Sequence, residues 1–586
     1  MNFNFFVLPF TIGFFIIIVV LGVRFTRWIW KLSKIDKLRI LHGFFTRRTL
    51  RAIREAWNES LLHKNIFKVN PFLGFMHMSL AFGWFLIIVV GHIEMYALTG
   101  NLTAMPWESV FFRYFEHTTS HAHAIFAHIM DTLLLLVLGG VGLALYKRVN
   151  MKFFGIRRNT QLRVSDKVAL YSLWAIFPMR LLAESATAGF YMNGGWLTNN
   201  IGHVFQLVNL NSNGELIFWW IYSISLGAFF VVLPFSRYMH IPTEVLYIFL
   251  KEYGIKLKRE YNSFSEIQVY SCSRCGICIE ACQMHHAKIS NNQSVYILKN
   301  IRDENITERK IYNCLLCGRC ETLCPVNLKL NDLRITLRIN ASKDFNSTYD
   351  FLEQPHNTEH AEVVYFAGCM SHLSPSIISA VETILKTTKT PYLFIDKEKG
   401  VCCGRPLMLA GQQKAALKLI NHNRESIIQS GAQTLITSCP ICYKTFKEDY
   451  ELGQMRILHH SEYIHELLTN KSLKISKSTQ KYIYHDPCEL GRGSDVYEEP
   501  RFILSQTGTL KTIENERQKS LCCGGSLGDV SLSMQERNRI THQTLLQLTK
   551  PNPDCIVTAC PLCKKTFAKQ KKVPVKDIAE IVVECM

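Results

Sequence analysis

The first 271 residues contain no cysteine, although the 586-residue chain has 20 of them. All 20 therefore lie in the second part of the chain, where most recur at spacings of a few residues. A disulfide framework would be spread through the fold, whereas closely spaced cysteines are typical of metal sites. The pattern predicts reduced, metal-binding cysteines in the cytoplasm.

Acidic residues are scarce in two early segments. Residues 24–71 hold twelve Lys/Arg against three Asp/Glu, and residues 147–167 hold seven against one. These segments lie between long apolar runs, where positive charge marks the cytoplasmic loops of membrane proteins. No basic face with interleaved aromatics accompanies them, so the net charge of +19 does not indicate a nucleic-acid partner.

A cleavable signal peptide is not expected. Residues 3–23 are apolar, but they lack a basic segment before them and a small-residue cleavage site after them. Their length matches the roughly 20 residues that a helix needs to cross a bilayer. They are predicted to form a first membrane span.

Five spans are predicted, and together they make residues 1–242 a five-helix transmembrane bundle. The loops after spans one and three are basic, and the loop at 191–213 has no charged residue, which places the N-terminus outside and the C-terminus in the cytoplasm. We expect a multi-pass protein of the inner membrane of a prokaryote. Residues 243–262 are predicted to form an amphipathic connector, with an ordinary linking helix as the alternative. The predicted spans are 3–23, 72–98, 119–146, 168–190 and 214–236.

Residues 263–345 contain two motifs of the form C-x2-C-x2-C-x3-C. Three cysteines of such a loop can bind one iron–sulfur cube, while the fourth points toward the other cube. Two cubane [4Fe–4S] clusters with crossed ligands are expected: Cys272, Cys275, Cys278 and Cys324 for one, and Cys314, Cys317, Cys320 and Cys282 for the other. The segment resembles the α-helical two-cluster ferredoxin domain, except that Gln283 stands where the bacterial pattern has proline.

A tandem duplication follows, at 361–470 and 480–586. Five cysteines of each copy correspond at offsets of 119 to 121 residues, and ITSCPICYKTF is repeated as IVTACPLCKKTF. Segments before the cysteines have strand character, and 411–430 and 531–548 have helical character, so each copy is predicted to be an α/β unit. The two sets are Cys369, Cys402, Cys403, Cys439 and Cys442, and Cys488, Cys522, Cys523, Cys560 and Cys563.

Each set resembles the CCG domain of heterodisulfide reductase catalytic subunits. The resemblance implies a non-cubane [4Fe–4S] cluster in each complete five-cysteine set. A zinc site or a redox-active thiol pair remains the alternative for each. Cys555 and Cys585 fall outside both sets and are expected to have no ligand role.

Two histidines at the cytoplasmic side of the bundle are candidate haem ligands. His77 lies near the start of span two and His240 at the end of span five, so both are at similar depth and fit the axial positions of one haem b. A buried hydrogen-bonded pair is the alternative. The surrounding segments resemble helices of the nitrate reductase gamma subunit, but that family's second haem ligands fall here on Ile87 and Tyr222.

His92 and His128 are predicted near the outer face, where they form a site for a second haem or, alternatively, for quinone or protons. Glu94 and Asp131 lie near them in the sequence. Arg180 and Glu184, four residues apart, form either a structural ion pair or contacts to haem propionates or quinone protons.

The whole arrangement resembles a fusion of a haem-bearing membrane subunit with a heterodisulfide-reductase-like subunit, as in membrane electron-transfer-flavoprotein dehydrogenases. The resemblance implies electron transfer between a cytoplasmic donor, electron-transferring flavoprotein by preference, and membrane (mena)quinone. No G-x-G-x-x-G motif is present, so a partner is expected to supply the flavin. The alternatives are a quinol-dependent disulfide reductase and an electron-transfer subunit of a larger complex.

Overall fold

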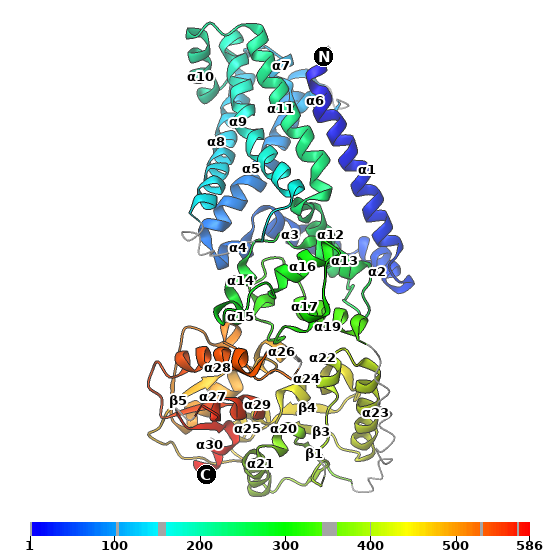
Figure 1. The fold of residues 1–586 in the computed structure, drawn as a ribbon, viewed down its shortest axis with the longest axis vertical. Helices are drawn as coiled ribbons and strands as arrows, with labels where there is room; N and C mark the ends of the chain where they lie inside the picture. The colour runs from blue at the N-terminus through cyan, green and yellow to red at the C-terminus, as the bar shows by residue number, and fades with distance from the viewer. Residues whose placement is uncertain are drawn as a thin grey trace. The chain divides into compact units, whose positions relative to one another are not determined.

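The structure is a computed structural model that describes residues 3–100, 105–150, 160–342, 360–398, 400–527, 531–570 and 573–586 (Figure 1). It divides into two compact units. The N-terminal unit comprises Met1–Leu257 and Asn262–Ile277, and the cysteine-rich unit comprises Lys258–Tyr261 and Cys278–Met586. The division passes through the predicted ferredoxin-type segment between Ile277 and Cys278. Each unit is described by itself.

The N-terminal unit is helical. In the described ranges, four helical segments are long and apolar enough to cross a membrane: Phe5–Trp30, Pro71–Thr99, His121–Val149 and Ser212–Phe235. They correspond to the first, second, third and fifth predicted spans. The helices of this unit are η1 (Phe5–Val7), α1 (Leu8–Trp30), α2 (Lys34–Phe44), α3 (Arg47–Ala56), η2 (Trp57–Leu61), α4 (Lys64–Val69), α5 (Pro71–Thr99), α6 (Pro106–Val110), α7 (Phe112–Phe115), α8 (His121–Val149), α9 (Val164–Tyr191), α10 (Trp196–Leu207), α11 (Ser212–Val232), η4 (Leu233–Phe235), η5 (Arg237–Met239), α12 (His240–Glu252) and α13 (Ser263–Ser271).

The fourth predicted span, 168–190, forms the long helix α9 but is not one of the four apolar segments. Its apolar run is interrupted by Arg180 and Glu184, and Asp166 and Lys167 stand in its first turn. Helix α9 packs against α10 and α11 (Figure 1). The prediction of five membrane spans is therefore not confirmed, while four apolar helices fit a membrane domain.

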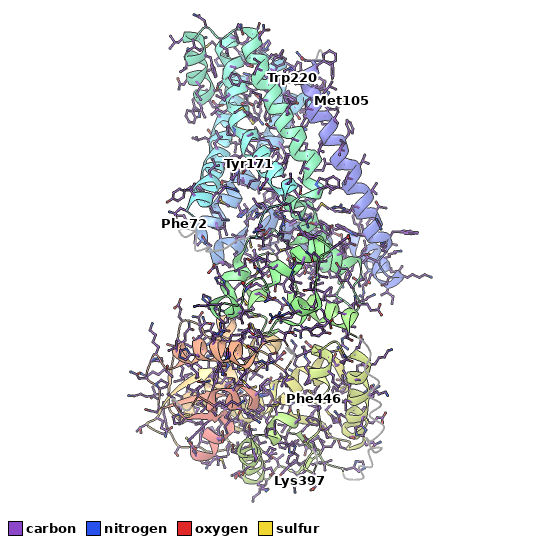
Figure 2. The ribbon with its side chains drawn as sticks, in the orientation of Figure 1. Phe72, Met105, Tyr171, Trp220, Lys397 and Phe446 are labelled. Carbon is purple, nitrogen blue, oxygen red and sulfur yellow. The ribbon has the colours of Figure 1, made fainter. Side chains whose placement is uncertain are left out.

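The apolar helices pack closely and leave apolar side chains on the outside of the unit. Helix α1 packs on α11, and a Cβ added to Gly13 would lie 2.7 Å from the Gly227 carbonyl oxygen, so the two backbones touch there. Small residues allow this approach between membrane helices. Large apolar side chains such as Phe72 and Tyr171 are exposed on the helices (Figure 2), as expected of surfaces that face lipid.

The predicted connector 243–262 is helical only in its first part, where it belongs to α12, which ends at Glu252. Helix α12 buries Tyr247, Ile248 and Leu250 and packs on α3 and α13 of the same unit. It therefore contributes to the packing of the N-terminal unit.

The cysteine-rich unit begins with short helices around the ferredoxin-type motifs. Short helices suit this region because cysteine-bearing loops occupy much of the chain. They are α14 (Ile277–Ala281, whose first residue belongs to the other unit), α15 (Gln283–His286), α16 (Ser294–Arg302), α17 (Glu308–Tyr312), α18 (Arg319–Thr322) and α19 (Leu330–Ala341).

Each duplicated copy forms a four-stranded parallel sheet flanked by helices. The first sheet has the order β2-β1-β3-β4 and the second β6-β5-β7-β8, so the copies share one topology. Val363 pairs with Thr434 in the first sheet, and Tyr482 with Cys555 in the second. The central strands are buried and apolar, as in sheets covered on both faces. The strands are β1 (Val363–Phe366), β2 (Tyr392–Phe394), β3 (Thr434–Thr437), β4 (Arg456–His459), β5 (Lys481–His485), β6 (Thr509–Lys511), β7 (Cys555–Thr558) and β8 (Val575–Asp577).

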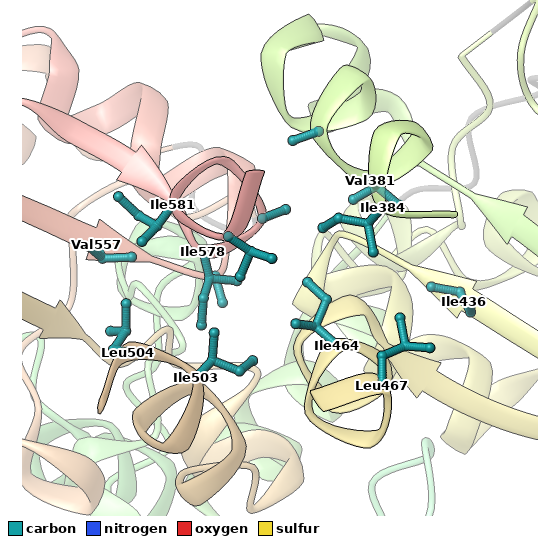
Figure 3. Close-up of a cluster of buried hydrophobic side chains, with 14 of the residues drawn as sticks. Val381, Ile384, Ile436, Ile464, Leu467, Ile503, Leu504, Val557, Ile578 and Ile581 are labelled. Carbon is teal, nitrogen blue, oxygen red and sulfur yellow. The ribbon is translucent and has the colours of Figure 1, made fainter. Parts of the chain in front are cut away.

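The predicted helices at 411–430 and 531–548 are present as α23 and α28. The two copies share one hydrophobic core (Figure 3), in which Ile384 and Ile464 of the first copy belong to the same cluster as Ile503 and Ile578 of the second. The duplicated part is thus a single packed body. Its helices are α20 (Cys369–His372), α21 (Pro375–Thr387), α22 (Arg405–Leu409), α23 (Gln413–Gln429), α24 (Pro440–Asp449), α25 (His460–Thr469), α26 (Gly491–Ser494), α27 (Glu498–Thr507), η6 (Arg517–Lys519), α28 (Met534–Leu548), α29 (Pro561–Ala568) and α30 (Ile578–Glu584).

Candidate metal centres

The first five-cysteine set lies at the carboxyl ends of β1 and β3. Cys369 begins α20 soon after β1, and Cys439 caps α24 soon after β3. The strand order reverses between these neighbours, and open parallel sheets bind ligands at such a switch point. The thiols contact one another in the order Cys369, Cys402, Cys403, Cys442 and Cys439.

The second set repeats this arrangement. Its thiols contact one another in the order Cys488, Cys522, Cys523, Cys563 and Cys560, which are the equivalent positions of the second copy. All 20 cysteines of the chain are free of disulfides. Five converging free thiols exceed the four ligands of a structural zinc ion, whereas thiolates are the usual ligands of iron–sulfur clusters. The donor set therefore fits an iron–sulfur cluster in each copy.

A glycine after each adjacent cysteine pair allows the chain to turn toward the next helix. Gly404 has a φ of 84° and Gly524 a φ of 85°, in the left-handed region that side chains disfavour. A Cβ on Gly524 would also lie 2.7 Å from Thr541 Oγ1. The Cys-Cys-Gly sequence of each copy is thus required by its backbone path as well as by its thiols.

The second ferredoxin-type motif brings together the four residues predicted for the second cubane. Cys282 lies within electrostatic range of Cys314 and Cys317, and Cys320 lies within range of the same two residues. All four belong to the cysteine-rich unit. This is the crossed arrangement expected from the spacing, and the ligand assignment itself stays a prediction.

The second five-cysteine set adjoins this motif. The Cys317 and Cys522 thiols are in contact, and a small cavity is lined by both of them. Arg492 Nε donates to the Cys317 carbonyl oxygen at 2.7 Å, and its Nη2 donates to Cys488 Sγ at 3.1 Å. The hydrogen bond from Cys522, aided by the positive charge of Arg492, lowers the pKa of Cys317 to about 5. Arg492 therefore contacts both the second five-cysteine set and the second ferredoxin-type motif, whose thiols also contact each other.

The two five-cysteine sets also adjoin one another. Cys439 of the first set lies within electrostatic range of Cys560 of the second. Nearby, Glu489 lies 3.2 Å from Lys444 Nζ and 3.9 Å from Arg405 Nη2, which links the copies by partly buried ion pairs. The sites thus follow one another in the order first set, second set, second ferredoxin-type motif.

The residues of the first ferredoxin-type motif are divided between the units: Cys272 and Cys275 belong to the N-terminal unit, and Cys278 and Cys324 to the cysteine-rich unit. In the N-terminal unit, Lys147 of α8 lies within electrostatic range of Cys275. Arg237 Nη2 donates to the Ser273 carbonyl oxygen at 2.9 Å. The Cys272–Cys275 loop is thus held against cationic residues of its own unit.

His77 and His240 lie in the same region of the N-terminal unit. His240 begins α12 and lies within electrostatic range of His77, as do Lys147 and Arg237. His240 Nδ1 is 2.8 Å from the Arg237 carbonyl oxygen. Because a carbonyl oxygen only accepts, Nδ1 carries the proton and Nε2 carries the lone pair that a metal ligand needs. The two side chains fit the haem hypothesis in placement and tautomer.

A third histidine joins this region. The His63 ring stacks on His77, with centroids 5.4 Å apart and an interplanar angle of 22°. His63 lies before α4 with a φ of 52°, outside the apolar helices. Because His63 lies outside the predicted membrane spans, the sequence pattern does not indicate that it is next to His77. His63 is therefore an additional candidate ligand beside His77.

His92 and His128 lie on exposed faces of α5 and α8, which pack against each other. Each Nδ1 is 2.7 Å from the carbonyl oxygen four residues earlier, so Nε2 is the acceptor nitrogen in both. His92 Nε2 lies 3.1 Å from Ser109 Oγ. This hydroxyl contact suits a polar site for quinone as well as a ligand position.

The positions that correspond to the second haem ligands of the nitrate reductase gamma family are packed with other side chains. Ile87 and Tyr222 are both buried. Arg180 Nη2 lies 2.8 Å from Glu184 Oε1, and Tyr222 makes a side-chain hydrogen bond with Arg180. The predicted Arg180–Glu184 pair is thus present and faces Tyr222 in the interior of the N-terminal unit.

Comparison with known families identifies the cysteine-bearing segments. Residues 363–447 and 482–568 each match the family described as "Cysteine-rich domain", and residues 268–328 match the family described as "4Fe-4S dicluster domain". The chain carries two cysteine-rich domains and a 4Fe–4S dicluster domain. It is therefore an iron–sulfur protein.

Three relatives are similar to part of this chain. Over 251 residues the chain is 29% identical to a dihydromethanophenazine:CoB–CoM heterodisulfide reductase subunit of Methanosarcina barkeri, which covers 39% of this chain and 60% of that protein. It is 28% identical over 253 residues to "EtfAB:quinone oxidoreductase" of Syntrophomonas wolfei, covering 40% of this chain and 35% of that protein. It is 24% identical over 248 residues to "Probable membrane-anchored ferredoxin" of Chromohalobacter salexigens, covering 39% and 37%.

The chain thus spans about 60% of the heterodisulfide reductase subunit and about a third of the other two proteins. The similarity supports the iron–sulfur character of the two cysteine-rich domains and the dicluster domain. Cys555 and Cys585, which are predicted to have no ligand role, belong to neither five-cysteine set. Cys555 is in β7, and Cys585 Sγ is 3.7 Å from the Thr507 carbonyl oxygen.

Proposed function

We propose that the protein is a membrane-bound oxidoreductase that passes electrons from a cytoplasmic flavoprotein, electron-transferring flavoprotein by preference, to membrane (mena)quinone. The observation that carries this proposal is the line of thiol sites in the cysteine-rich unit. The first set adjoins the second through Cys439 and Cys560, and the second adjoins the dicluster domain through Cys522 and Cys317. Such a line suits stepwise transfer better than isolated catalysis at one site.

The 18 cysteines of the sequence motifs are the proposed ligands of two cubane and two non-cubane [4Fe–4S] clusters. Bound clusters and haem would supply one-electron carriers at these positions. The protein's own contribution is to fix their spacing. Arg492 does this by bonding Cys317 and Cys488 at once, and Lys444 and Arg405 do it by binding Glu489 across the copies.

At the membrane end, His77 and His240 are the residues that would hold a haem b. Lys147 and Arg237 lie within electrostatic range of His77, and Lys147 also lies within range of Cys275. Positive charge at this place suits the propionates of a haem as well as a neighbouring iron–sulfur site. The N-terminal unit therefore offers a short connection between the first ferredoxin-type loop and the histidines.

We place quinone chemistry, or alternatively a second haem, at His92 and His128. The Ser109 hydroxyl, whose Oγ lies 3.1 Å from His92 Nε2, favours the quinone interpretation, because this hydroxyl can donate a hydrogen bond to a quinone carbonyl. We further propose that the protein is multi-pass in the inner membrane of a prokaryote, with its N-terminus outside and the iron–sulfur domains in the cytoplasm. The basic segments 24–71 and 147–167 support this orientation.

The proposed donor rests on two observations. The sequence has no G-x-G-x-x-G motif, so a flavin is expected to come from a partner. The chain is similar over 253 residues to a protein named EtfAB:quinone oxidoreductase. The second candidate function is a quinol-dependent disulfide reductase, which the similarity to a heterodisulfide reductase subunit favours. The third candidate function is that of an electron-transfer subunit in a larger complex.

One assay separates these functions. The purified protein in lipid vesicles is mixed with reduced electron-transferring flavoprotein and a menaquinone analogue, and separately with the quinol and a thiol disulfide. The proposal predicts flavoprotein-dependent quinone reduction and little disulfide-dependent quinol oxidation. The reverse result would establish the disulfide reductase, and activity in neither arm until a further subunit is added would support the larger complex.

A further inference from the structure

The two cysteine-rich domains differ in the residues that contact equivalent thiols. Three residues before the first cysteine of its set, the first copy has Phe366 and the second copy has His485. Four residues after that cysteine, the first copy has Leu373 and the second copy has Arg492. The five thiols follow the same order of contacts in both copies. Any difference in redox behaviour must therefore arise from what surrounds the thiols.

His485 and Phe366 end equivalent strands and pack in the same way. His485 packs edge-to-face on Phe567 with centroids 4.8 Å apart, and Phe366 packs edge-to-face on Phe446 with centroids 5.0 Å apart. Both are 2% exposed. The substitution of histidine for phenylalanine thus changes the polarity of the site while keeping its packing.

The imidazole of His485 is directed at the second set. A ring nitrogen and the Sγ atoms of Cys523 and Cys563 all lie within 4.8 Å of one another. The side chain lies close enough to Cys523 to favour negative charge on its sulfur. In the described part of the chain, the buried Nε2 of His485 has no hydrogen-bond partner, so this nitrogen is available to the sulfur site beside it.

Arg492 provides a second donor to the same set. Its Nη2 donates to Cys488 Sγ at 3.1 Å, and its guanidinium lies within electrostatic range of Cys522. Leu373, the equivalent residue of the first copy, is 58% exposed and apolar. The second set therefore has two nitrogen donors at positions where the first copy has hydrocarbon.

The first copy has cations nearby, but carboxylates pair with them. Arg405, which takes the place of Gly525, lies 3.3 Å from Glu448 and 3.9 Å from Asp449. His372, three residues after Cys369, lies 3.4 Å from Asp396. These two side chains therefore have carboxylate partners, whereas Arg492 donates to the Cys488 thiol and to backbone carbonyls.

Hydrogen bonds and positive charge at the sulfurs of an iron–sulfur site favour its reduced, more negative state and raise its potential. We propose that His485 and Arg492 make the second cysteine-rich domain the higher-potential site of the two. An electron that reaches the first set then moves favourably to the second, which adjoins Cys317 of the dicluster domain. This inference rests on the proposed function and adds to it the direction of transfer, from the first set through the second set to the dicluster domain.

The test is a redox titration of the purified full-length holoprotein with small-molecule mediators, followed by electron paramagnetic resonance. A Cys442→Ala variant, which removes a first-set ligand, identifies the first-set signal. His485→Phe gives the second copy the first copy's residue and is expected to lower only the second-set potential. The expected shift is about tenfold in the ratio of reduced to oxidised site at fixed ambient potential, or about 59 mV for one electron. Phe366→His is the reciprocal control and is expected to raise only the first-set potential.

A wild-type second-set potential at or below that of the first set would overturn the inference. So would a His485→Phe protein with full iron content and unchanged potentials. If that variant loses iron, pulsed resonance on wild-type protein with ¹⁵N-labelled histidine replaces it. A nitrogen coupling on the second-set signal alone supports the inference, and its absence overturns it. No flavoprotein or quinone enters these measurements, so their outcome is independent of the test of the proposed function.

Discussion

Gln283 forms two hydrogen bonds with the backbone of Cys522. Its Nε2 donates to the Cys522 carbonyl oxygen at 3.3 Å, and its Oε1 accepts from the Cys522 amide at 2.5 Å. Gln283 directly follows Cys282, a predicted ligand of the second cubane. One side chain thus fixes the second cysteine-rich domain to the dicluster domain at the point where their thiols meet.

Replacing Gln283 tests this connection. Gln283→Ala leaves the buried Cys522 amide without its partner, which is expected to cost about 1–3 kcal/mol of stability. It is also expected to slow electron transfer between the second set and the dicluster domain. Thermal unfolding with iron analysis measures the first effect, and rapid-mixing kinetics measures the second. Gln293→Ala, a buried glutamine that bonds Ile289 within its own segment, is the matched control; equal transfer rates in both variants would contradict the role of Gln283.

The iron content of the chain is expected to be about 16 atoms, from four clusters of four irons. Cys403→Ala and Cys523→Ala are each expected to lose about four of these, because each removes one thiol of a five-cysteine set. Cys555→Ala is the control and is expected to retain them all. Iron near 8 atoms in the wild-type protein would mean that the two cysteine-rich domains hold no clusters.

Single substitutions can identify which histidines bind the haem. His77→Ala and His240→Ala are each expected to abolish haem b, as measured by the pyridine haemochrome spectrum. His63→Ala decides whether the histidine stacked on His77 is a ligand or a neighbour, since only a ligand is essential for haem retention. His128→Ala is expected to retain the haem at this site. Iron-replete wild-type protein without haem would contradict the proposal altogether.

Burial raises the pKa of Glu244 to about 8, and neighbouring Glu59 adds to the effect. A carboxyl that titrates higher in the folded than in the unfolded state binds more protons when folded, so stability falls as pH rises from about 4.5 to about 8. The largest effect by linkage is about 5 kcal/mol. Glu244→Gln is expected to remove most of this loss, measured by thermal unfolding in detergent at pH 5 and pH 9. The exposed Glu308→Gln is the control, and an equal pH dependence in both variants would refute the assignment.

The cysteine spacing was sufficient to predict much of the site. The offsets of 119 to 121 residues predicted two equivalent sets, and the structure gives their thiols the same order of contacts. The crossed ligand pattern of the two ferredoxin-type motifs predicted that Cys282 lies near Cys314 and Cys317, and it does. These features depend on local chain geometry, which short-range sequence patterns encode.

Other features depend on tertiary packing and were beyond the sequence. Gln283 departs from the ferredoxin pattern without any local sign of its role, because its partner Cys522 lies 239 residues away. His63 was missed because it lies outside the apolar segments. The contact between Cys317 and Cys522 joins two domains whose separate motifs contain no signal for it. Helix α9 was predicted as the fourth span, although buried Arg180 and Glu184 lower its apolar character.

In the proposed function, electrons from a cytoplasmic flavoprotein reach the membrane histidines by way of the thiol sites. The most direct test mixes reduced electron-transferring flavoprotein with the oxidised holoprotein and follows the haem b absorbance in a stopped-flow instrument. The account predicts haem reduction in the wild-type protein and its loss in Cys522→Ala, whose thiol adjoins Cys317. Haem reduction at the wild-type rate in Cys522→Ala protein that retains haem would contradict the path.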